Sequence, residues 1–213
     1  MPASTTNNIS KINQDDINKA VWNACDTFRG VISADTYKDF ILTMLFLKYL
    51  SDVYRDEYNK LVEQFGGSGN DNPELIHAMM SKQRFVLPEG ASFWDLYEQR
   101  HQPGNGQRID EALHAIEEAN GTKLKNVFQD ISFNTDKLGQ EKQKNELLRH
   151  LLEDFGKDIL NLSAERVGSL DVIGNAYEYL IKHFAASSGA TAGEFYTPQP
   201  VAKLMTQIAF LGR

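Results

Sequence analysis

The sequence predicts an all-α protein, a multi-helix bundle with one long central helix. Apolar residues recur with a 3.6-residue period in most segments, which is typical of amphipathic helices. The longest such segment runs from residue 37 to residue 65 between two clear stop signals. No five-residue segment alternates convincingly between apolar and polar side chains over a β-branched run, so no strand is predicted.

Bulk composition limits the classes of protein. With 213 residues, 41% of them hydrophobic, the chain can form one core, or one domain and part of a second. The net charge of −7 does not indicate nucleic-acid binding, so any DNA contact needs a local basic surface or a partner.

The sequence also predicts a soluble protein in a reducing, cytoplasmic compartment, with no membrane partner. A single cysteine, Cys25, excludes a disulfide within the chain. The polar N-terminus lacks the apolar region of a signal peptide. The most apolar run, Phe40 to Leu50, is too short to span a bilayer and contains Lys48.

The first expected helix begins after residues 1–12, which are predicted to be disordered. Asn13 is a plausible N-cap, and Asp16 lies near the positive end of the helix dipole. Apolar residues then recur at helical spacing until Gly30, which ends the pattern as a C′ glycine. Cys25 lies on the apolar face and is interpreted as a core residue.

The second expected helix is the central one. Ser33 can cap it, and Gly66 and Gly67 stop it. About 30 residues make a rod of roughly 45 Å. Around residues 40–50 it is apolar on nearly all sides, so it is expected to be buried in the middle of the bundle.

Shorter elements are expected in the middle of the chain. Asn72 and Pro73 start a helix that runs to Phe85. Ser92 caps a short helix that carries four apolar residues, Phe93, Trp94, Leu96 and Tyr97. Residues 101–107 are predicted to be a loop, followed by a helix over 109–119 that Gly121 closes.

Helices are also expected toward the C-terminus. Residues 128–139 are predicted to be irregular with isolated apolar anchors, followed by a helix over 141–155. A polar joint near 163–169 precedes a helix capped by Asp171, and a last helix runs over 200–211.

Familiar catalytic motifs are absent from the sequence. There is no GxxxxGK[ST], GxGxxG, GxSxG or HExxH pattern, and a single cysteine with five scattered histidines does not predict a metal site. His150 near Glu153 and Asp154 is interpreted as part of a solvated helix face. Basic positions such as Lys48 are mixed with acids and are interpreted in the same way.

The stretch GEFYTP, residues 193–198, allows two interpretations. It can be a joint between helices, with Gly193 for the turn and prolines to start the next helix. It can also line a ligand pocket, because free N–H groups at a helix start suit a carboxylate or phosphate and an aromatic pair precedes them. The residues alone leave both open.

The chain resembles the modification (M) subunit of type I restriction-modification systems from about Asn13 to its C-terminus. Four blocks carry this resemblance: VWNACDTFRGVISADTYKDFILTMLFLKYLSDVY at 21–54, FVLP leading to FWDL at 85–96, VFQDISFNTDKLG at 127–139, and DVIGNAYEYLIKHFA followed by GEFYTP at 171–198. Members of that family are S-adenosyl-L-methionine-dependent DNA adenine-N6 methyltransferases.

The resemblance implies a cofactor site at the GEFYTP segment. In that family the matching segment contributes to the S-adenosyl-L-methionine pocket near its methionine end, and the carboxylate of the cofactor suits a helix N-terminus. The implied cofactor-binding residues are Glu194, Phe195, Tyr196, Thr197 and Pro198. Glu194 is assigned to polar or cationic groups of the cofactor, and Thr197 to its methionine end.

The chain departs from the family pattern in lacking the glycine-rich cofactor loop and the Asn-Pro-Pro-aromatic tetrapeptide that holds a flipped adenine. The expectation is therefore an N-terminal fragment without catalytic residues, inactive alone. Residues 1–165 would form the helical domain, and 166–213 a linker helix and the first segment of a truncated α/β methyltransferase domain.

The resemblance also implies a set of partners. They are DNA, the specificity (S) subunit and a second M subunit, with the restriction (R) subunit as a further candidate. The alternative is a non-enzymatic helical module that binds protein or DNA, and a stand-alone DNA-binding protein is disfavoured by the net acidity. An Asn-Pro-Pro-aromatic motif downstream would distinguish the first interpretation from the alternative.

Overall fold

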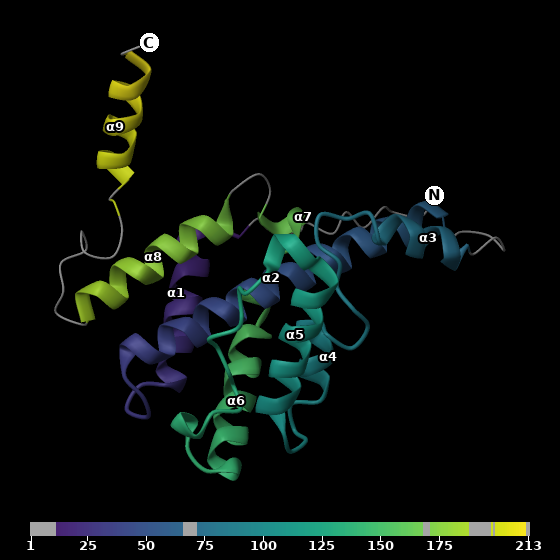
Figure 1. Cartoon of the computed structure of the whole chain (residues 1–213), viewed down its shortest axis with the longest axis horizontal. Helices are drawn as coiled ribbons and strands as arrows, with labels where there is room; N and C mark the ends of the chain where they lie inside the picture. Colours follow the sequence, from purple (N-terminus) through teal and green to yellow (C-terminus); the bar gives the residue numbers. More distant parts are fainter. Residues whose placement is uncertain (1–11, 66–71, 168–170, 188–196, 198, 212–213) are drawn as a thin grey trace, which may run out of the picture.

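The computed structural model describes residues 12–65, 72–167, 171–187, 197 and 199–211. Helices are the regular secondary structure in these ranges, joined by turns and loops. Figure 1 shows the long helix α2 crossing the bundle, with the other helices arranged around it. Within these ranges no strand occurs, which confirms the prediction of an all-α fold.

The described elements are numbered in their order along the chain. The α-helices are α1 Gln14–Ala24, α2 Ala34–Phe65, α3 Pro73–Met80, α4 Phe93–Glu98, α5 Asn105–Leu124, α6 Glu141–Phe155, α7 Ala164–Val167, α8 Val172–Ser187 and α9 Gln199–Leu211. Single 3₁₀ turns are η1 Cys25–Thr27, η2 Asp136–Leu138 and η3 Asp158–Leu160.

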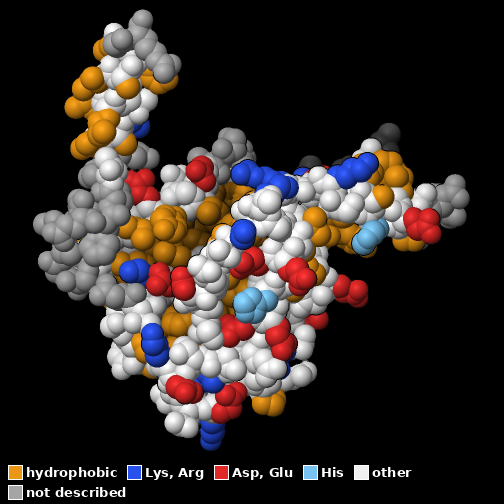
Figure 2. All heavy atoms as spheres, viewed as in Figure 1, with side chains coloured by type: hydrophobic (Ala, Val, Ile, Leu, Met, Phe, Trp, Pro, Cys, Tyr) orange, Lys and Arg blue, Asp and Glu red, His pale blue; other side chains and the backbone are white. Residues whose placement is uncertain are grey.

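Charged side chains of both signs are interspersed on the face of the molecule in Figure 2, where hydrophobic side chains also gather over α8 and the neighbouring part of α2. No helix in the described ranges is both long and apolar enough to cross a bilayer.

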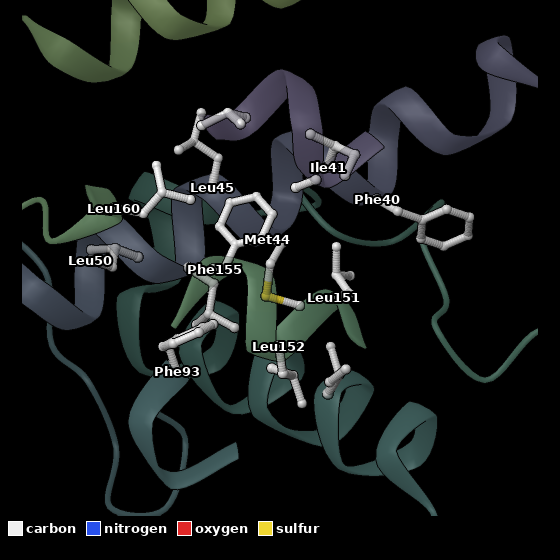
Figure 3. Packing of buried hydrophobic residues seen from close by; sticks show 14 of the residues in the cluster. Phe40, Ile41, Met44, Leu45, Leu50, Phe93, Leu151, Leu152, Phe155 and Leu160 are labelled. Carbon is white, nitrogen blue, oxygen red and sulfur yellow. The ribbon is translucent and has the colours of Figure 1, made fainter. Parts of the chain in front are cut away.

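One part of the hydrophobic core forms where α2 meets α6. Met44 of α2 and Leu151, Leu152 and Phe155 of α6 have no exposed surface. Figure 3 shows these side chains converging with Phe93 of α4. Burial of this kind contributes about 25 cal/mol for each Å² of apolar surface removed from water, so the face shared by α2 and α6 is a main source of stability. The prediction of a buried central helix is confirmed.

Helix starts follow the polar caps expected from the sequence, because each cap oxygen accepts a backbone N–H that the first turn leaves unpaired. Ser92 and Asp95 complete a reciprocal capping box. The cap bonds are Asn13 Oδ1 to Asp15 N at 2.6 Å, Asn72 Oδ1 to Leu75 N at 3.0 Å, Ser92 Oγ to Asp95 N at 3.1 Å and Asp171 Oδ1 to Gly174 N at 2.9 Å.

Helix α5 begins inside the segment predicted to be a loop. The backbone N–H of Asn105 donates to Asn145 Oδ1 of α6 at 2.9 Å, so a contact between distant segments holds the first turn. Gly106 lies so close to the backbone of residues 133–134 that an added Cβ would meet Phe133 O at 2.6 Å. The predicted stop at Gly121 is a kink with φ of 43° rather than the end of the helix.

Three further boundaries differ from the predictions. Helix α3 ends at Met80 instead of Phe85, and Phe85 packs its ring against Phe46, with centroids 6.3 Å apart. Ile12, predicted to be disordered, is buried and donates its N–H to the carbonyl of Arg166 at 3.1 Å. The polar joint near 163–169 contains the helical turn α7. The first two differences involve a partner far away in the sequence.

Cys25 is buried as predicted, and its thiol is expected to be inert. Desolvation by burial raises its pKa from 9.0 to about 12. Between these values only the unfolded thiol ionises, so its contribution to the free energy of unfolding falls by about 1.4 kcal/mol for each pH unit. Urea titrations from pH 8 to pH 11 should show a smaller decline for Cys25→Ala than for the wild type. Modification of the native thiol by a disulfide reagent at the rate of free cysteine would contradict this account.

Candidate junction with a cofactor-binding domain

Helix α8 anchors the part of the chain that leads to the predicted cofactor segment. Its inner face repeats every four residues with Val172, Ala176, Leu180 and Phe184, all at most 3% exposed. This face packs against α1 and α2. Because these four apolar residues share one side of the helix, their burial holds α8 against the bundle.

Aromatic rings hold the C-terminal end of α8. The ring of Phe184 lies 5.7 Å from Trp22 of α1 and 5.6 Å from Tyr37 of α2, measured between centroids. The ring of His183 lies tilted against Trp22, with centroids 4.9 Å apart, and against Tyr179, with centroids 4.0 Å apart. Such contacts add to the stability gained from burial alone. The point from which the chain continues toward residue 197 is therefore fixed relative to α1 and α2.

The predicted cofactor residues lie beyond this point. Thr197 is exposed and comes just before α9. The other four, Glu194, Phe195, Tyr196 and Pro198, lie outside the described residues. The helix predicted after GEFYTP is confirmed as α9, Gln199–Leu211, and the cofactor role of the five residues stays a prediction.

Helix α9 presents an apolar stripe to solvent. Val201, Leu204, Met205 and Ile208 follow one another at helical spacing and are 46–61% exposed. Figure 1 shows α9 separate from the bundle, and Figure 2 shows hydrophobic side chains along it. An apolar stripe of this width is typical of a helix that packs against another structural element.

A buried ion pair in α2 was missed from the sequence, which predicted a solvated Lys48. Lys48 and Asp52 pair at i and i+4, and both side chains have no exposed surface. Lys48 Nζ also donates to Leu160 O at 2.8 Å. Asp52 accepts from Trp94 Nε1 at 2.9 Å and from Leu162 N at 2.8 Å. The one available signal was the placement of Lys48 within the most apolar run of the chain.

This ion pair stabilises the fold rather than forming a reactive centre. Burial lowers the pKa of the Lys48 ammonium, because the loss of hydration outweighs the attraction of the Asp52 carboxylate. The ammonium lies over the ring of Trp94 at 4.7 Å and has no exposed surface. Because both side chains are buried, the pair acts by joining α2, α4 and residues 160–162.

A further cavity lies on the C-terminal half of α2, away from α8. It measures about 850 Å³ and is lined by Tyr54, Tyr58 and Trp94, among others. The Arg55 guanidinium stacks on the ring of Trp94 at 4.2 Å. This cavity is therefore separate from the junction at α8.

Two protein families match successive parts of the chain. The HsdM N-terminal domain family matches residues 17–155, and the N-6 DNA Methylase family matches residues 168–211. The first match spans the helices from α1 to α6, and the second begins just before α8 and contains α9.

Individual proteins agree with these matches. The methylase subunit of the type I restriction enzyme MpnII from Mycoplasma pneumoniae is 26% identical over 91% of this chain and 39% of its own length. The corresponding MjaIX subunit from Methanocaldococcus jannaschii is 27% identical over 88% of this chain and 34% of its own length. The chain therefore spans little more than a third of these relatives.

A solved structure resembles the whole fold. It is a type I restriction-modification system methyltransferase subunit from Streptococcus thermophilus, with a TM-score of 0.73 and 29% sequence identity. The similarity covers 94% of this chain and 45% of that one. The helical arrangement in Figure 1 thus corresponds to less than half of that protein.

Proposed function

Because the chain belongs to the HsdM N-terminal domain family, we propose that it is the N-terminal part of the modification subunit of a type I restriction-modification complex. The observation that carries the proposal is the order of the two family matches along one polypeptide. The match to the methylase family also disfavours the alternative of a purely non-enzymatic helical module. The proposed boundary near residue 165 lies between the two matched regions.

The proposed activity of the complete subunit is methylation of adenine N6 in DNA. A flipped adenine would present its exocyclic amine, at an unstacking cost of a few kcal/mol. S-adenosyl-L-methionine supplies the activated methyl group when bound. The residues present suit this cofactor, because the first turn of a helix leaves backbone N–H groups without an intrahelical partner, here those of the first turn of α9 other than Pro200, and the exposed Thr197 lies two residues before Gln199.

The proposed role of the chain itself is assembly and positioning. The bundle would help to clamp DNA and would dock the specificity subunit, a second modification subunit and the restriction subunit. Glu194, Phe195, Tyr196, Thr197 and Pro198 would form one edge of the cofactor site. Without the remaining pocket, the 213-residue chain alone should neither methylate DNA nor bind the cofactor with micromolar affinity.

The test uses the full-length subunit. Tyr196→Ala with Thr197→Ala should weaken cofactor binding by about tenfold or more, because one or two direct contacts are worth roughly 1.4 kcal/mol or more. Calorimetry measures the affinity, and thermal unfolding measures stability. Thr206→Ala is the matched control, since its hydroxyl donates only within α9, to Ala202 O at 2.8 Å. Unchanged affinity together with lost stability in the double variant would favour the simple helix joint.

A further inference from the structure

A second apolar surface lies beside α8, along one flank of its packed face. Helix α2, residues 124–131 and α8 enclose a groove of about 360 Å³. Figure 2 shows hydrophobic side chains gathered over α8 and the adjoining α2. The side chains that matter for the argument are Leu42, Phe46, Val127, Ile131, Ile173 and Tyr177.

The groove combines an anchored floor with an exposed rim. Leu42, Phe46 and Ile173 are half-buried and pack against the core beneath them. At the rim, Val127 is 49% exposed and Tyr177 is 51% exposed. A rim of this kind, with one carboxylate (Asp39) among its lining residues, favours an apolar protein surface over an anionic ligand.

The loop that carries Val127 is held in place rather than free. The Glu117 carboxylate accepts the N–H of Asn126 at 2.6 Å and the N–H of Phe128 at 3.3 Å, on either side of Val127. Asn126 has a φ of 61°, which these bonds stabilise. The exposed valine is therefore presented by a preformed surface, and binding there would cost little ordering entropy.

We infer that the methylase domain of the same polypeptide packs against this groove. Its two walls belong to different families: Leu42 and Val127 lie in the HsdM N-terminal match, whereas Ile173 and Tyr177 lie in the N-6 DNA Methylase match. More than half of the length of the relatives lies outside the part that matches this chain, which is enough residues for such a domain. Helix α9, with its exposed stripe, follows α8 in the same match.

The inferred contact would determine how the methylase domain is oriented on the bundle. Since α8 is fixed on α1 and α2, a second contact at Tyr177 and Val127 would prevent rotation of that domain about the connection to α9. The inference rests on the proposed function, because it needs a methylase domain in the complete subunit.

Hydrogen exchange measures whether the groove is covered. Amides of residues 124–131 and 173–177 should exchange at least about tenfold more slowly in the full-length subunit than in the 213-residue chain. Tyr177→Lys in the full-length subunit should remove this protection and should speed proteolysis within residues 188–198 by a similar factor. Both effects follow because a lysine at the rim cannot be desolvated against an apolar surface.

Tyr58→Lys is the matched control, because Tyr58 also lies on a helix and is 47% exposed, but lines the other cavity. It should leave both rates unchanged. Equal exchange in the long and short chains would overturn the inference. So would protection that disappears on dilution to a monomer, or that requires the specificity subunit, since another molecule would then cover the groove.

Failure of the proposed function has a different signature. A full-length subunit that shows the expected protection but transfers no methyl group to DNA, with its partner subunits present, would contradict the function and leave the groove assignment intact. Methyl transfer without protection would contradict the groove assignment alone.

Discussion

Lys48→Met is expected to lower the free energy of unfolding by about 3–5 kcal/mol, the usual effect of breaking a buried ion pair. The substitution leaves the buried Asp52 carboxylate without its hydrogen-bonded cation and removes the Lys48 donor to the carbonyl of Leu160. Asp52 keeps the neutral donors from Trp94 and Leu162 and a longer contact with the half-exposed Arg55 guanidinium, 3.8 Å from Nη2 to Oδ1. Urea denaturation followed by circular dichroism measures the change.

Two further variants test the explanation. Lys60→Met, on the same helix, breaks an exposed pair with Glu57 at 3.8 Å and should change stability by less than about 1 kcal/mol. Adding Asp52→Asn to Lys48→Met should recover part of the loss, because a neutral amide replaces the unpaired charge. If Lys48→Met costs no more than Lys60→Met, the pair has no structural role.

Phe155→Ala is expected to cost about 3–5 kcal/mol, the usual price of removing a fully buried aromatic side chain. Phe155 has no exposed surface and ends α6, where Figure 3 places it beside Met44 of α2. The cavity cannot collapse easily, because the next residue, Gly156, lies against the ring of Tyr97. Thermal and urea unfolding measure the loss.

Ile159→Ala is the matched control for Phe155→Ala. Ile159 is an apolar residue four positions later and is 37% exposed, so its truncation should cost less than about 1 kcal/mol. Similar losses for the two variants would show that the contact between α2 and α6 is not a main source of stability.

Local signals in the sequence were sufficient for most helices. Asn13, Asn72, Ser92 and Asp171 cap their helices through bonds that span two or three residues. The apolar period of residues 37–65 predicted a long buried helix because burial follows one face of a regular helix. The resemblance to modification subunits, found in the same blocks, is confirmed by the family match.

The misplaced boundaries share a physical cause. The start of α5 depends on Asn145, forty residues later, and the order at Ile12 depends on the carbonyl of Arg166. Neither partner is visible in a window of the chain. Residues 101–107 have a low helix propensity, which is why a loop was predicted there. Tertiary hydrogen bonds at Asn105 outweigh this low propensity and start the helix inside the segment.

The sequence by itself determined the helical class, the capped helix starts, the family and the segment expected to meet the cofactor. Only the tertiary structure decided that Lys48 is buried against Asp52, and that α8 and the loop at Val127 enclose one apolar groove. Apolar periodicity and helix capping depend on residues a few positions apart, so they can be recognised from the sequence. Whether a charge is buried, or two distant apolar residues share a surface, depends on how whole helices pack against one another.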